Sequence, residues 1–600
     1  MRSRSLSWLR RASQSLDRSG SVTAPSRASS SNVRFGPRNK RERKMTSSTT
    51  DALVRENSPE IVVGTERPDV VSPATELRSR AVLDPDFEFI RSGAGKSHTF
   101  GSLDERSDAI ATGLTSLGLS KGDRLAIVLP TCVEYIELIF ACAKLGVIFV
   151  PLNIYLKGEF LAHQLVTSGA TVIVGDAAAM RSVNNIEWAG RERPSAVRVL
   201  VGEPEDEATQ GGLVAYESLA EHGSDVPAVD VAPNDLMSLM FTSGTTGLSK
   251  ACKLSHAYYF QVARMYIAAE WVASGDRIMT ALPLYHAGGQ IAVLMSALFS
   301  RSSVTLVPTF SASNFMRQAH EEGATSIWGV AAMAAAVLAQ PEAEDPDMHG
   351  QLRVAVWIPL DKDRQENFER RFGTRVVCDG YGQTEATAIT LNPVSAPRQI
   401  GSLGFPASLI DVRIVDGMDN ELAAGEVGEF AIRPLAPGAI FSGYWQNDAA
   451  TVEATTNMWY HTGDYGRKRN DGAFEFVDRK RDALRRRGEN VSSIELEASI
   501  RRHPLIDEVA VHGVPSAMAE DDIKACIVAK GEKPEPSELL EFFEQNLPYF
   551  GVPRYVEFID SLPVNSVGRV LKHQLREVGI GADTIDLTGD RRTAGKDRRR

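Results

Sequence analysis

A nine-residue segment, Thr242–Lys250, concentrates residue types that bind phosphate. It holds five hydroxyl side chains, two glycines and one lysine. Glycine lets backbone N–H groups approach an anion closely, hydroxyls add hydrogen-bond donors, and lysine supplies a compact positive charge. Residues 235–241 form an apolar run typical of a short strand, so the segment should follow a strand end. The sequence therefore predicts a phosphate-binding loop formed by Thr242, Ser243, Gly244, Thr245, Thr246, Gly247 and Lys250.

The spacing differs from that of the Walker A loop. Lys250 follows Ser249 rather than a glycine, and the segment contains no Gly-Lys-Ser/Thr. Residues 95–97 do spell Gly-Lys-Ser, but Ile90 occupies the position of that motif's first glycine. A surface turn rich in Ser, Thr and Gly is the alternative interpretation of Thr242–Lys250 taken alone.

Four later segments also carry charged residues, three of them together with glycine. They are Gly380–Glu385, Trp459–Asp464, Asp478–Asp482 and Gly488–Val491. Together with the first loop, their order resembles the adenylate-forming superfamily, which includes acyl-CoA synthetases, luciferases and the adenylation domains of peptide synthetases. The resemblance extends from about Thr99 to Glu577.

Apolar stretches alternate with helical patterns through most of the chain. Residues 124–130 and 147–151 have strand patterns, whereas 104–117 and 134–145 have helical ones. This alternation favours an α/β fold with parallel strands. The resemblance implies a large N-terminal domain of layered sheets and helices and a small, mobile α+β C-terminal domain. We expect a disordered basic extension, two AMP-binding domains and a disordered tail at residues 1–70, 71–480, 481–580 and 581–600.

The resemblance implies a reaction in two steps. A carboxylate attacks the α-phosphate of ATP to give an acyl-adenylate and pyrophosphate, and a thiol then takes the acyl group. Positioned donors and Mg²⁺ stabilise the negative charge that develops. Thr384 and Glu385 are suited to phosphate binding and Mg²⁺ coordination, because a carboxylate is a hard oxygen ligand. The nucleotide would also contact Gly380, Tyr381, Asp464 and Arg479, with Asp464 accepting the ribose hydroxyls, although Asp464 alone could be a turn residue.

Two further segments are candidates for the acid site. Pro283–His286 resembles a family motif whose aromatic residue and histidine line the acid channel, which makes His286 a candidate catalytic residue. A histidine packed in the core is the alternative. Ser326–Val330 is a candidate wall of the acyl pocket, and Trp328 within it could equally belong to the core.

The C-terminal motifs imply a change of orientation between the two steps. Arg481 lies in the family's pivot between an adenylating and a thioester-forming arrangement. Arg485 and Gly488, in the basic run that ends at Gly488, would then face the phosphates of CoA. An exposed basic face is the alternative.

Three positions depart from the family pattern. Ser249 and Ala251 replace the usual Pro and Gly, and Val354–Ile358 replaces a Gly-Gly-Ala-Pro run that contacts adenine. Arg569 replaces the lysine that contacts the carboxylate and the α-phosphate, and Lys572 follows three residues later. The planar fork of arginine differs from an ammonium group. Arg569 and Lys572 therefore both remain candidates for the catalytic cation of adenylation.

Composition sets wider limits. The 600 residues carry a net charge of −11, which argues against nucleic-acid binding. Residues 1–50 are basic, at about +10, and fit either a mitochondrial transit peptide or an extension upstream of Met45 in a cytoplasmic protein. Five scattered cysteines predict reduced thiols, not a structural metal site. No apolar run reaches the roughly 18 residues that a membrane span needs.

The sequence thus predicts an acid:CoA ligase that uses ATP, Mg²⁺, CoA and a small carboxylic acid. Arg485–Glu497 looks closest to carnitine/crotonobetaine-type CoA ligases. One alternative is an adenylating ligase with an acceptor other than CoA. Another is an ATP-binding protein whose catalysis was lost through the change at Arg569. The retained phosphate and ribose residues favour the enzyme.

Overall fold

The computed structural model describes residues 72–587 with internal gaps. The gaps are residues 93–96, 189–193, 205–211, 243–247, 399, 480–482, 487–488, 517–520, 564–569 and 571. The predicted extension and the last residues of the predicted tail therefore lie outside the described residues. So do the predicted site residues Ser243, Gly244, Thr245, Thr246, Gly247, Arg481, Gly488 and Arg569. Arg479 and Arg485 are described by their backbones alone.

One seven-stranded sheet carries the predicted phosphate-binding segment. In sheet order its strands are β7 (Val214–Ala215), β6 (Val197–Leu200), β5 (Val172–Gly175), β3 (Arg124–Val128), β4 (Ile148–Pro151), β8 (Leu236–Thr242) and β9 (Lys250–Ser255). The strands are parallel except β9, which pairs antiparallel with β8. The central strands are apolar and buried, as expected where a sheet is covered on both faces.

A second seven-stranded sheet is also mainly parallel. Its order is β14 (Val376–Val377), β13 (Val354–Ile358), β12 (Ser326–Val330), β10 (Arg277–Thr280), β11 (Ser303–Leu306), β1 (Glu88–Ser92) and β2 (Ser97–Thr99). Only β2 runs antiparallel to its neighbour. Because parallel neighbours end at the same edge, the segments that follow β10, β11, β12 and β13 meet at one side of this sheet.

A layer of buried helices joins the two sheets. It consists of α4 (Val133–Leu145), α8 (His256–Ala268), the π-helical turn η2 (Gly288–Met295) and α9 (Ser296–Ser300). These helices are buried nearly all round, which is typical of helices in the interior of a large domain. The main hydrophobic core includes Phe149 of the first sheet and Ile278 of the second, together with side chains from this layer.

Several of the other helices of this part begin with a side-chain cap. A capping box between Thr99 and Ser102 starts α3, and Asp361 caps α12, which ends at Gly373 in the left-handed conformation. These helices are α2 (Pro73–Leu83), α3 (Phe100–Ser116), α5 (Gly158–Ser168), α6 (Ala177–Asn184), α10 (Phe315–Glu321), α11 (Ala331–Leu338), α12 (Lys362–Phe372) and α13 (Asp448–Ala454), with 3₁₀ turns η1 (Tyr216–His222), η3 (Glu342–Glu344) and η4 (Thr456–Met458).

Two small antiparallel sheets carry the next motifs. The first is β15 (Gly380–Gln383), β16 (Ala386–Leu391) and β17 (Phe405–Pro406); the second is β18 (Ile410–Val415), β19 (Val427–Pro434), β20 (Tyr460–Lys468) and β21 (Phe474–Arg479). The segment Gly380–Glu385 thus forms β15 and the turn after it, whereas Asp464 lies within β20.

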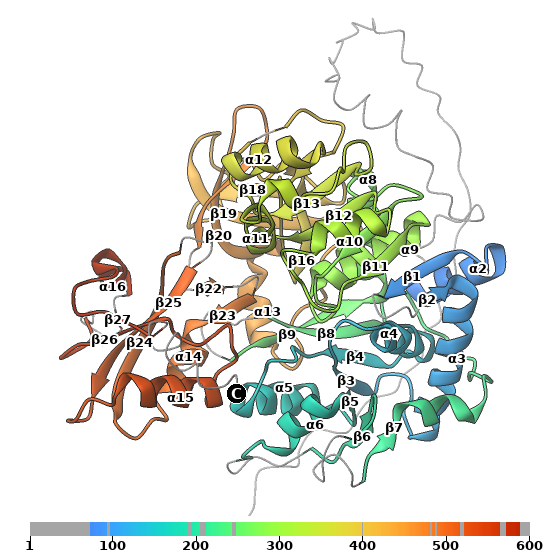
Figure 1. Cartoon of the computed structure of the whole chain (residues 1–600), viewed down its shortest axis with the longest axis horizontal. Coiled ribbons are helices and arrows are strands. Elements are labelled where there is room, and N and C mark those ends of the chain that lie inside the picture. Colours follow the sequence, from blue (N-terminus) through green and yellow to red (C-terminus); the bar gives the residue numbers. More distant parts are fainter. Residues whose placement is uncertain are drawn as a thin grey trace, which may run out of the picture. The chain divides into compact units, whose positions relative to one another are not determined.

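The last part of the chain, orange to red in Figure 1, has its own sheets and helices. They are the hairpin β22 (Ala483–Arg486) and β23 (Glu489–Ser492), the sheet β24 (Ile506–Pro515), β25 (Asp521–Ala529), β26 (Tyr555–Phe558) and β27 (Ile585–Asp586), and helices α14 (Ser493–Ile500), α15 (Pro536–Asn546) and α16 (Lys572–Val578). Strand β27 pairs with β26, so this sheet continues past residue 580, where the predicted domain ended.

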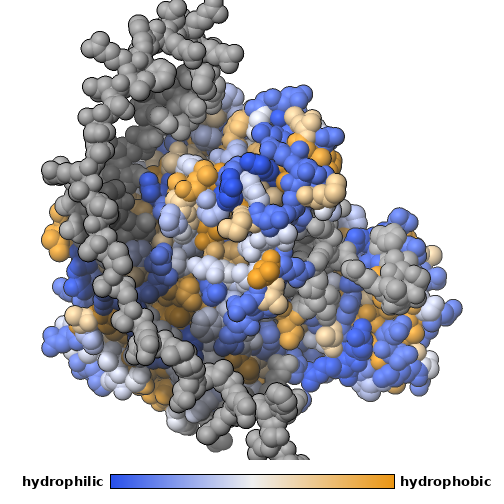
Figure 2. All heavy atoms as spheres, turned by 180° about the vertical axis from the view of Figure 1, so that it is seen from behind, coloured by the Kyte–Doolittle hydropathy of each residue, from blue (hydrophilic) through white to orange (hydrophobic). Residues whose placement is uncertain are grey.

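None of the helices in the described part of the chain is long and apolar enough to cross a bilayer. On the face drawn in Figure 2, hydrophobic residues lie in small groups among hydrophilic ones.

Candidate active site

The predicted motifs meet at a cavity of about 2020 Å³. Its lining includes the end of β8, the start of β9, the turn between β15 and β16, and part of β20. Segments that follow β10, β11, β12 and β13 line it as well. Distant stretches of sequence therefore converge on one site, as the ends of parallel strands commonly do.

The β8–β9 hairpin places both ends of the phosphate-binding segment at the cavity. Thr242, the last residue of β8, pairs with Lys250, the first residue of β9. The intervening residues 243–247 lie outside the described residues. The register of the hairpin alone brings a hydroxyl and an ammonium group to the same edge of the sheet.

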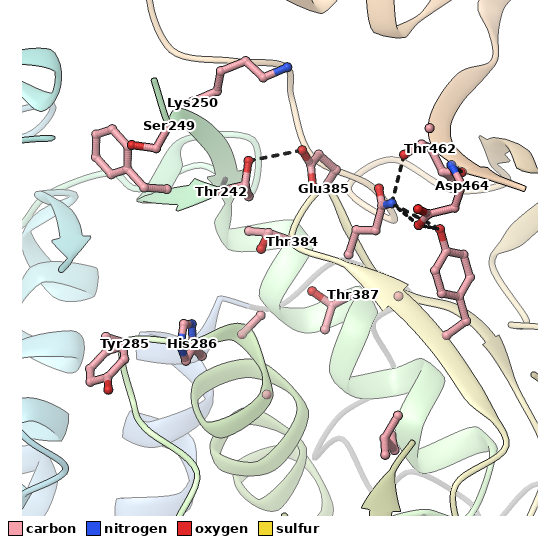
Figure 3. Close-up of a pocket in the computed structure, with 18 of the residues that line it drawn as sticks. Thr242, Ser249, Lys250, Tyr285, His286, Thr384, Glu385, Thr387, Thr462 and Asp464 are labelled. Carbon is pink, nitrogen blue, oxygen red and sulfur yellow. Dashed lines mark hydrogen bonds between the residues drawn. The ribbon is translucent and has the colours of Figure 1, made fainter. Parts of the chain in front are cut away.

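Glu385 lies beside this hairpin (Figure 3). Its Oε1 accepts a hydrogen bond from Thr242 Oγ1 at 3.4 Å and one from the Tyr444 hydroxyl at 2.8 Å. Lys250 Nζ lies 4.2 Å from the centroid of the Tyr444 ring. Burial and the charge of Glu385 raise the pKa of Tyr444, so its hydroxyl stays protonated and donates. Tyr444 thus links the acidic and the basic residue.

Tyr258 on α8 fixes the turn that carries Thr384 and Glu385. Its hydroxyl donates to the Thr384 carbonyl at 2.9 Å and accepts from the Thr387 N–H at 2.8 Å. The side chain is fully buried, and burial raises its pKa. One tyrosine therefore satisfies two backbone groups of the turn at once.

Asp464 is buried and held by two residues of β15. Its Oδ2 accepts from the Tyr381 hydroxyl at 2.6 Å and from Gln383 Nε2 at 2.7 Å. Gln383 Nε2 also donates to the Thr462 carbonyl at 2.9 Å, and the Tyr460 hydroxyl donates to Gln383 Oε1 at 2.9 Å. These contacts set the position of the carboxylate (Figure 3).

His286 lies on the other side of Thr384 and Thr387 from Asp464 (Figure 3). It occupies a short turn before η2, and a π-helical turn is frequent near functional sites. Gln290 in η2 holds this turn, because its Nε2 donates to the Leu284 carbonyl at 2.8 Å. The Tyr259 hydroxyl, which lies 2.8 Å from Ser238 Oγ, donates to Gln290 Oε1.

Two known protein families match successive parts of this chain. The family described as "AMP-binding enzyme" matches residues 77–445, and the family of its C-terminal domain matches residues 495–569. The chain belongs to the AMP-binding enzymes.

Named relatives of this AMP-binding enzyme are CoA ligases. Crotonobetaine/carnitine–CoA ligases from Salmonella paratyphi A and Salmonella typhimurium are 32% identical to it, over 81% of this chain and 94% of theirs. A fatty acyl CoA synthetase from Mycobacterium tuberculosis matches with a TM-score of 0.62 at 25% identity, covering 84% of this chain and 98% of its own.

A further solved structure shows the same fold. A double mutant of the o-succinylbenzoate CoA synthetase from Bacillus subtilis matches with a TM-score of 0.73 at 23% identity, over 84% of this chain and 98% of its own. The predicted α/β fold and the predicted class of enzyme, an ATP-dependent acid–thiol ligase that forms an acyl-adenylate, are confirmed.

The structure brings together most of the predicted site residues that it describes in this AMP-binding enzyme. The residues that line the cavity are Thr242, Lys250, His286, Gly380, Tyr381, Thr384, Glu385 and Asp464. Arg479 pairs through its backbone with Asp464 across β20 and β21. Tyr444, Tyr258 and Gln290 escaped the motif analysis, because their contacts join segments far apart in the sequence. Gln383 lies inside the motif Gly380–Glu385, but no role was predicted for it.

Lys572 is engaged elsewhere in the fold. Its Nζ lies 2.6 Å from Glu497 Oε1 and donates to Ser493 Oγ at 2.7 Å. Both partners belong to α14, so the lysine joins α16 to α14. Arg569, the other candidate for the adenylation step, lies outside the described residues.

Burial bears on two further segments. Trp328 is buried, donates to Ser326 Oγ at 3.1 Å and packs in the core, whereas Val330 of the same strand lines the cavity. Arg486, next to the predicted CoA residue Arg485, is also buried. It donates to the Val552 carbonyl and lies 3.4 Å from Asp522. The Arg486 side chain therefore contacts other residues of the C-terminal part.

Glu385 is a suitable ligand for Mg²⁺ on chemical grounds, since a carboxylate oxygen faces the phosphate-binding hairpin. Among the described residues, no group of three or more His, Cys, Asp and Glu side chains could hold a metal ion. Mg²⁺ commonly binds through one or two carboxylates plus substrate phosphates. A single glutamate therefore fits an ion that arrives with ATP.

Proposed function

We propose that this cavity joins a carboxylic acid to the α-phosphate of ATP and then passes the acyl group to CoA. The observation that carries the proposal is the placement of Thr242, Lys250 and Glu385 on one side of the cavity and Asp464 on another. An acid oxygen would bond to the α-phosphorus while the bond to the bridging oxygen breaks and pyrophosphate leaves. The CoA sulfur would then bond to the acyl carbon while AMP leaves and the thiol proton passes to solvent.

The β- and γ-phosphates would lie against the β8–β9 hairpin. Thr242 and Lys250 would supply a hydroxyl donor and a positive charge there, together with the loop residues 243–247. Glu385 and Thr384 would hold Mg²⁺ and a phosphate oxygen, and the ion would neutralise phosphate charge when bound. Asp464, positioned by Tyr381 and Gln383, would accept the ribose hydroxyls, with Arg479 on the neighbouring strand.

The acid would enter on the His286 side of the turn. His286 can donate to a carboxylate and hold it near the α-phosphate, which converts a two-molecule encounter into a positioned reaction. Gln290 fixes the turn that carries His286, so the position of His286 is set before the substrate binds.

Arg569 is proposed as the cation that stabilises the adenylation step, because Lys572 is bound to Glu497 and Ser493. Arg485 and Gly488 would contact CoA in the second step, after rotation about Arg481. Losing one well-placed donor to developing charge typically costs about 2.7–4 kcal/mol, so Arg569→Ala should slow adenylation by roughly 10²–10³.

ATP–pyrophosphate exchange tests the proposal on the full-length chain. Mg²⁺ and a panel of short, branched and aromatic carboxylates would be supplied, and Glu385→Gln would be compared with Glu344→Gln, an exposed residue in η3. Exchange that is lost only in Glu385→Gln supports the reaction. ATP binding without exchange for any acid would instead indicate a protein that binds nucleotide without catalysis.

Product analysis then separates the acceptors. Formation of an acyl thioester that requires CoA supports the second step. Adenylate formation that leads to another acylated product, with CoA present but unused, would assign a different acceptor.

A further inference from the structure

Among the described residues that line the cavity around His286, the His286 imidazole is the one side chain that can carry a charge. The segments after β10, β11, β12 and β13 contribute Leu282, Phe310, Met333 and Pro359 to this wall. Among the described cavity-lining residues, none from 281–289, 308–310, 330–333 or 358–359 is Asp, Glu, Lys or Arg. The polar groups at this end are hydroxyls, such as Thr309, and the His286 ring.

The charged residues of the cavity come from other segments. Its acidic residues lie at positions 385, 416–464 and 521, and its basic residues are Lys250 and Arg576. Figure 3 shows Glu385 and Asp464 on the far side of Thr384 and Thr387 from Tyr285 and His286. Charge is thus concentrated where the nucleotide is proposed to bind.

The largest aromatic side chains near this end do not form an open cage. Tyr266, Trp271 and Trp328 pack against one another, with ring centroids 5.5, 5.8 and 5.8 Å apart. All three are buried, and the Trp271 ring donates to the Asn392 carbonyl at 2.8 Å. Tyr266 and Trp271 line the cavity, but their burial leaves little ring surface for cation–π contact with a ligand. Of the other aromatic residues at this end, Tyr285 is also buried, and Phe310 packs against Phe315 with ring centroids 5.4 Å apart.

We infer that the acid substrate has an uncharged, mainly apolar side chain, and that the site discriminates against acids carrying a quaternary ammonium group. This rests on the proposed function. Crotonobetaine and carnitine, which name the relatives, both carry such a group. A quaternary ammonium has no proton to lose, so in this pocket it would be buried as a charge without an anionic partner or an aromatic cage. An apolar wall makes that costly.

Two acids of the same shape provide the test. In 5,5-dimethylhexanoate a carbon atom replaces the nitrogen of 4-(trimethylammonio)butanoate, so the pair differs by one charge. Exchange rates for both would be measured with the full-length chain, together with the binding of the two matching acyl-sulfamoyl adenosines. We expect kcat/KM and affinity to favour the neutral member by at least about tenfold.

The outcomes separate this inference from the proposed function. Equal or better use of the ammonium acid would overturn the inference and leave the ligase activity intact. Better use of adipate than of hexanoate would overturn it as well, since the second carboxylate also adds charge. If neither acid of the pair and no acid of the panel supports exchange, the proposed function fails, and the inference fails with it. Exchange with other acids of the panel but with neither member of the pair, together with no binding of either analogue, would overturn the inference alone.

A substitution in the wall provides a second test. Ala332, in the first turn of α11, lines the cavity, and an aspartate is tolerated well near a helix N-terminus. Ala332→Asp should lower the preference for the neutral acid at least about tenfold relative to Ala332→Asn, which matches its shape without the charge. An identical preference in both variants would show that this wall does not set the selectivity.

Discussion

At the scale of single residues, the contact between Glu385 and Tyr444 organises the side of the cavity where the phosphates are proposed to bind. The tyrosine hydroxyl donates to the carboxylate, and its ring lies under the Lys250 ammonium group. A hydrogen bond to a charged group contributes about 1.5–3 kcal/mol, and a cation–π contact contributes less at a partly exposed site. The hydroxyl should therefore matter more than the ring.

Tyr444→Phe tests this ranking, because it removes the hydroxyl and keeps the ring. We expect the rate of ATP–pyrophosphate exchange to fall roughly 10- to 100-fold, with a higher Mg²⁺ requirement, since the Glu385 carboxylate loses its strongest donor. Tyr444→Leu removes both contacts and should add only a small further loss. A Phe variant as active as the wild type would show that the hydroxyl does not position Glu385.

Motif composition predicted the residues that supply charge and hydroxyl groups, but not all of those that hold them in place. Thr242, Lys250, Glu385 and Asp464 stand in glycine-containing segments whose composition signals phosphate or sugar binding. Tyr444 stands in no such segment, and its contact with Glu385 spans 59 residues of sequence. A single sequence carries no signal for a contact of this kind.

At the scale of elements, α8 positions the turn at Thr384 and also buries an ionisable side chain, which lowers the stability of the fold. Tyr258 satisfies the turn at Thr384, whereas His256, the first residue of the helix, is fully buried. Neither ring nitrogen of His256 has a hydrogen-bond partner among the described residues. Burial lowers the pKa of His256 from 6.5 to about 4, with Asp235 raising it and Lys121 lowering it by smaller amounts.

His256 should make the fold sensitive to acid. Above about pH 6.5 the ring is neutral in both the folded and the unfolded chain, so it has no effect on pH dependence. Between 6.5 and 4 only the unfolded chain takes up the proton, so stability falls as pH falls. Below that range both states are protonated, and the total loss levels off at roughly 3 kcal/mol.

His256→Leu should remove this contribution, which thermal unfolding can measure. From about pH 7.5 to about pH 5, the melting temperature of the wild type should fall more than that of the variant, because the variant has no proton to bind at this site. His222→Asn, at an exposed position in η1, is the control and should follow the wild type. Parallel curves for wild type and His256→Leu would rule out His256 as the titrating group.

At the scale of the whole molecule, the sequence pattern predicted the presence of strands and helices more readily than the order in which the strands pair. Alternating strands and helices indicated an α/β fold, and the strands predicted at 124–130 and 147–151 and the helices predicted at 104–117 and 134–145 are confirmed in β3, β4, α3 and α4. The order of the strands could not be predicted from the sequence, because β1 joins the sheet of β10–β14 across more than 200 residues of sequence. Strand β27 was missed because two residues carry no usable periodicity.

The contacts of Lys572 in the C-terminal part allow an experiment to distinguish a structural from a catalytic role for this residue. Its ammonium group joins α16 to Glu497 and Ser493 of α14, and Glu497 Oε1 also accepts from the Val511 N–H at 2.7 Å. Removing one partner leaves the other charge partly buried and uncompensated, which costs more than removing both. Lys572→Met should therefore destabilise this part by about 2 kcal/mol, and Glu497→Gln in the same chain should recover much of that loss.

Urea unfolding and separate assays of the two half-reactions distinguish the roles of Lys572. With a structural role, Lys572→Met should slow ATP–pyrophosphate exchange and thioester formation from a synthetic acyl-adenylate to a similar, modest degree, and the double variant should recover both. With a role as the adenylation cation, exchange alone should fall, by roughly 10²–10³, and Glu497→Gln should restore none of it. The ion pair with Glu497 favours the first outcome, which leaves Arg569 as the residue whose substitution should affect adenylation alone.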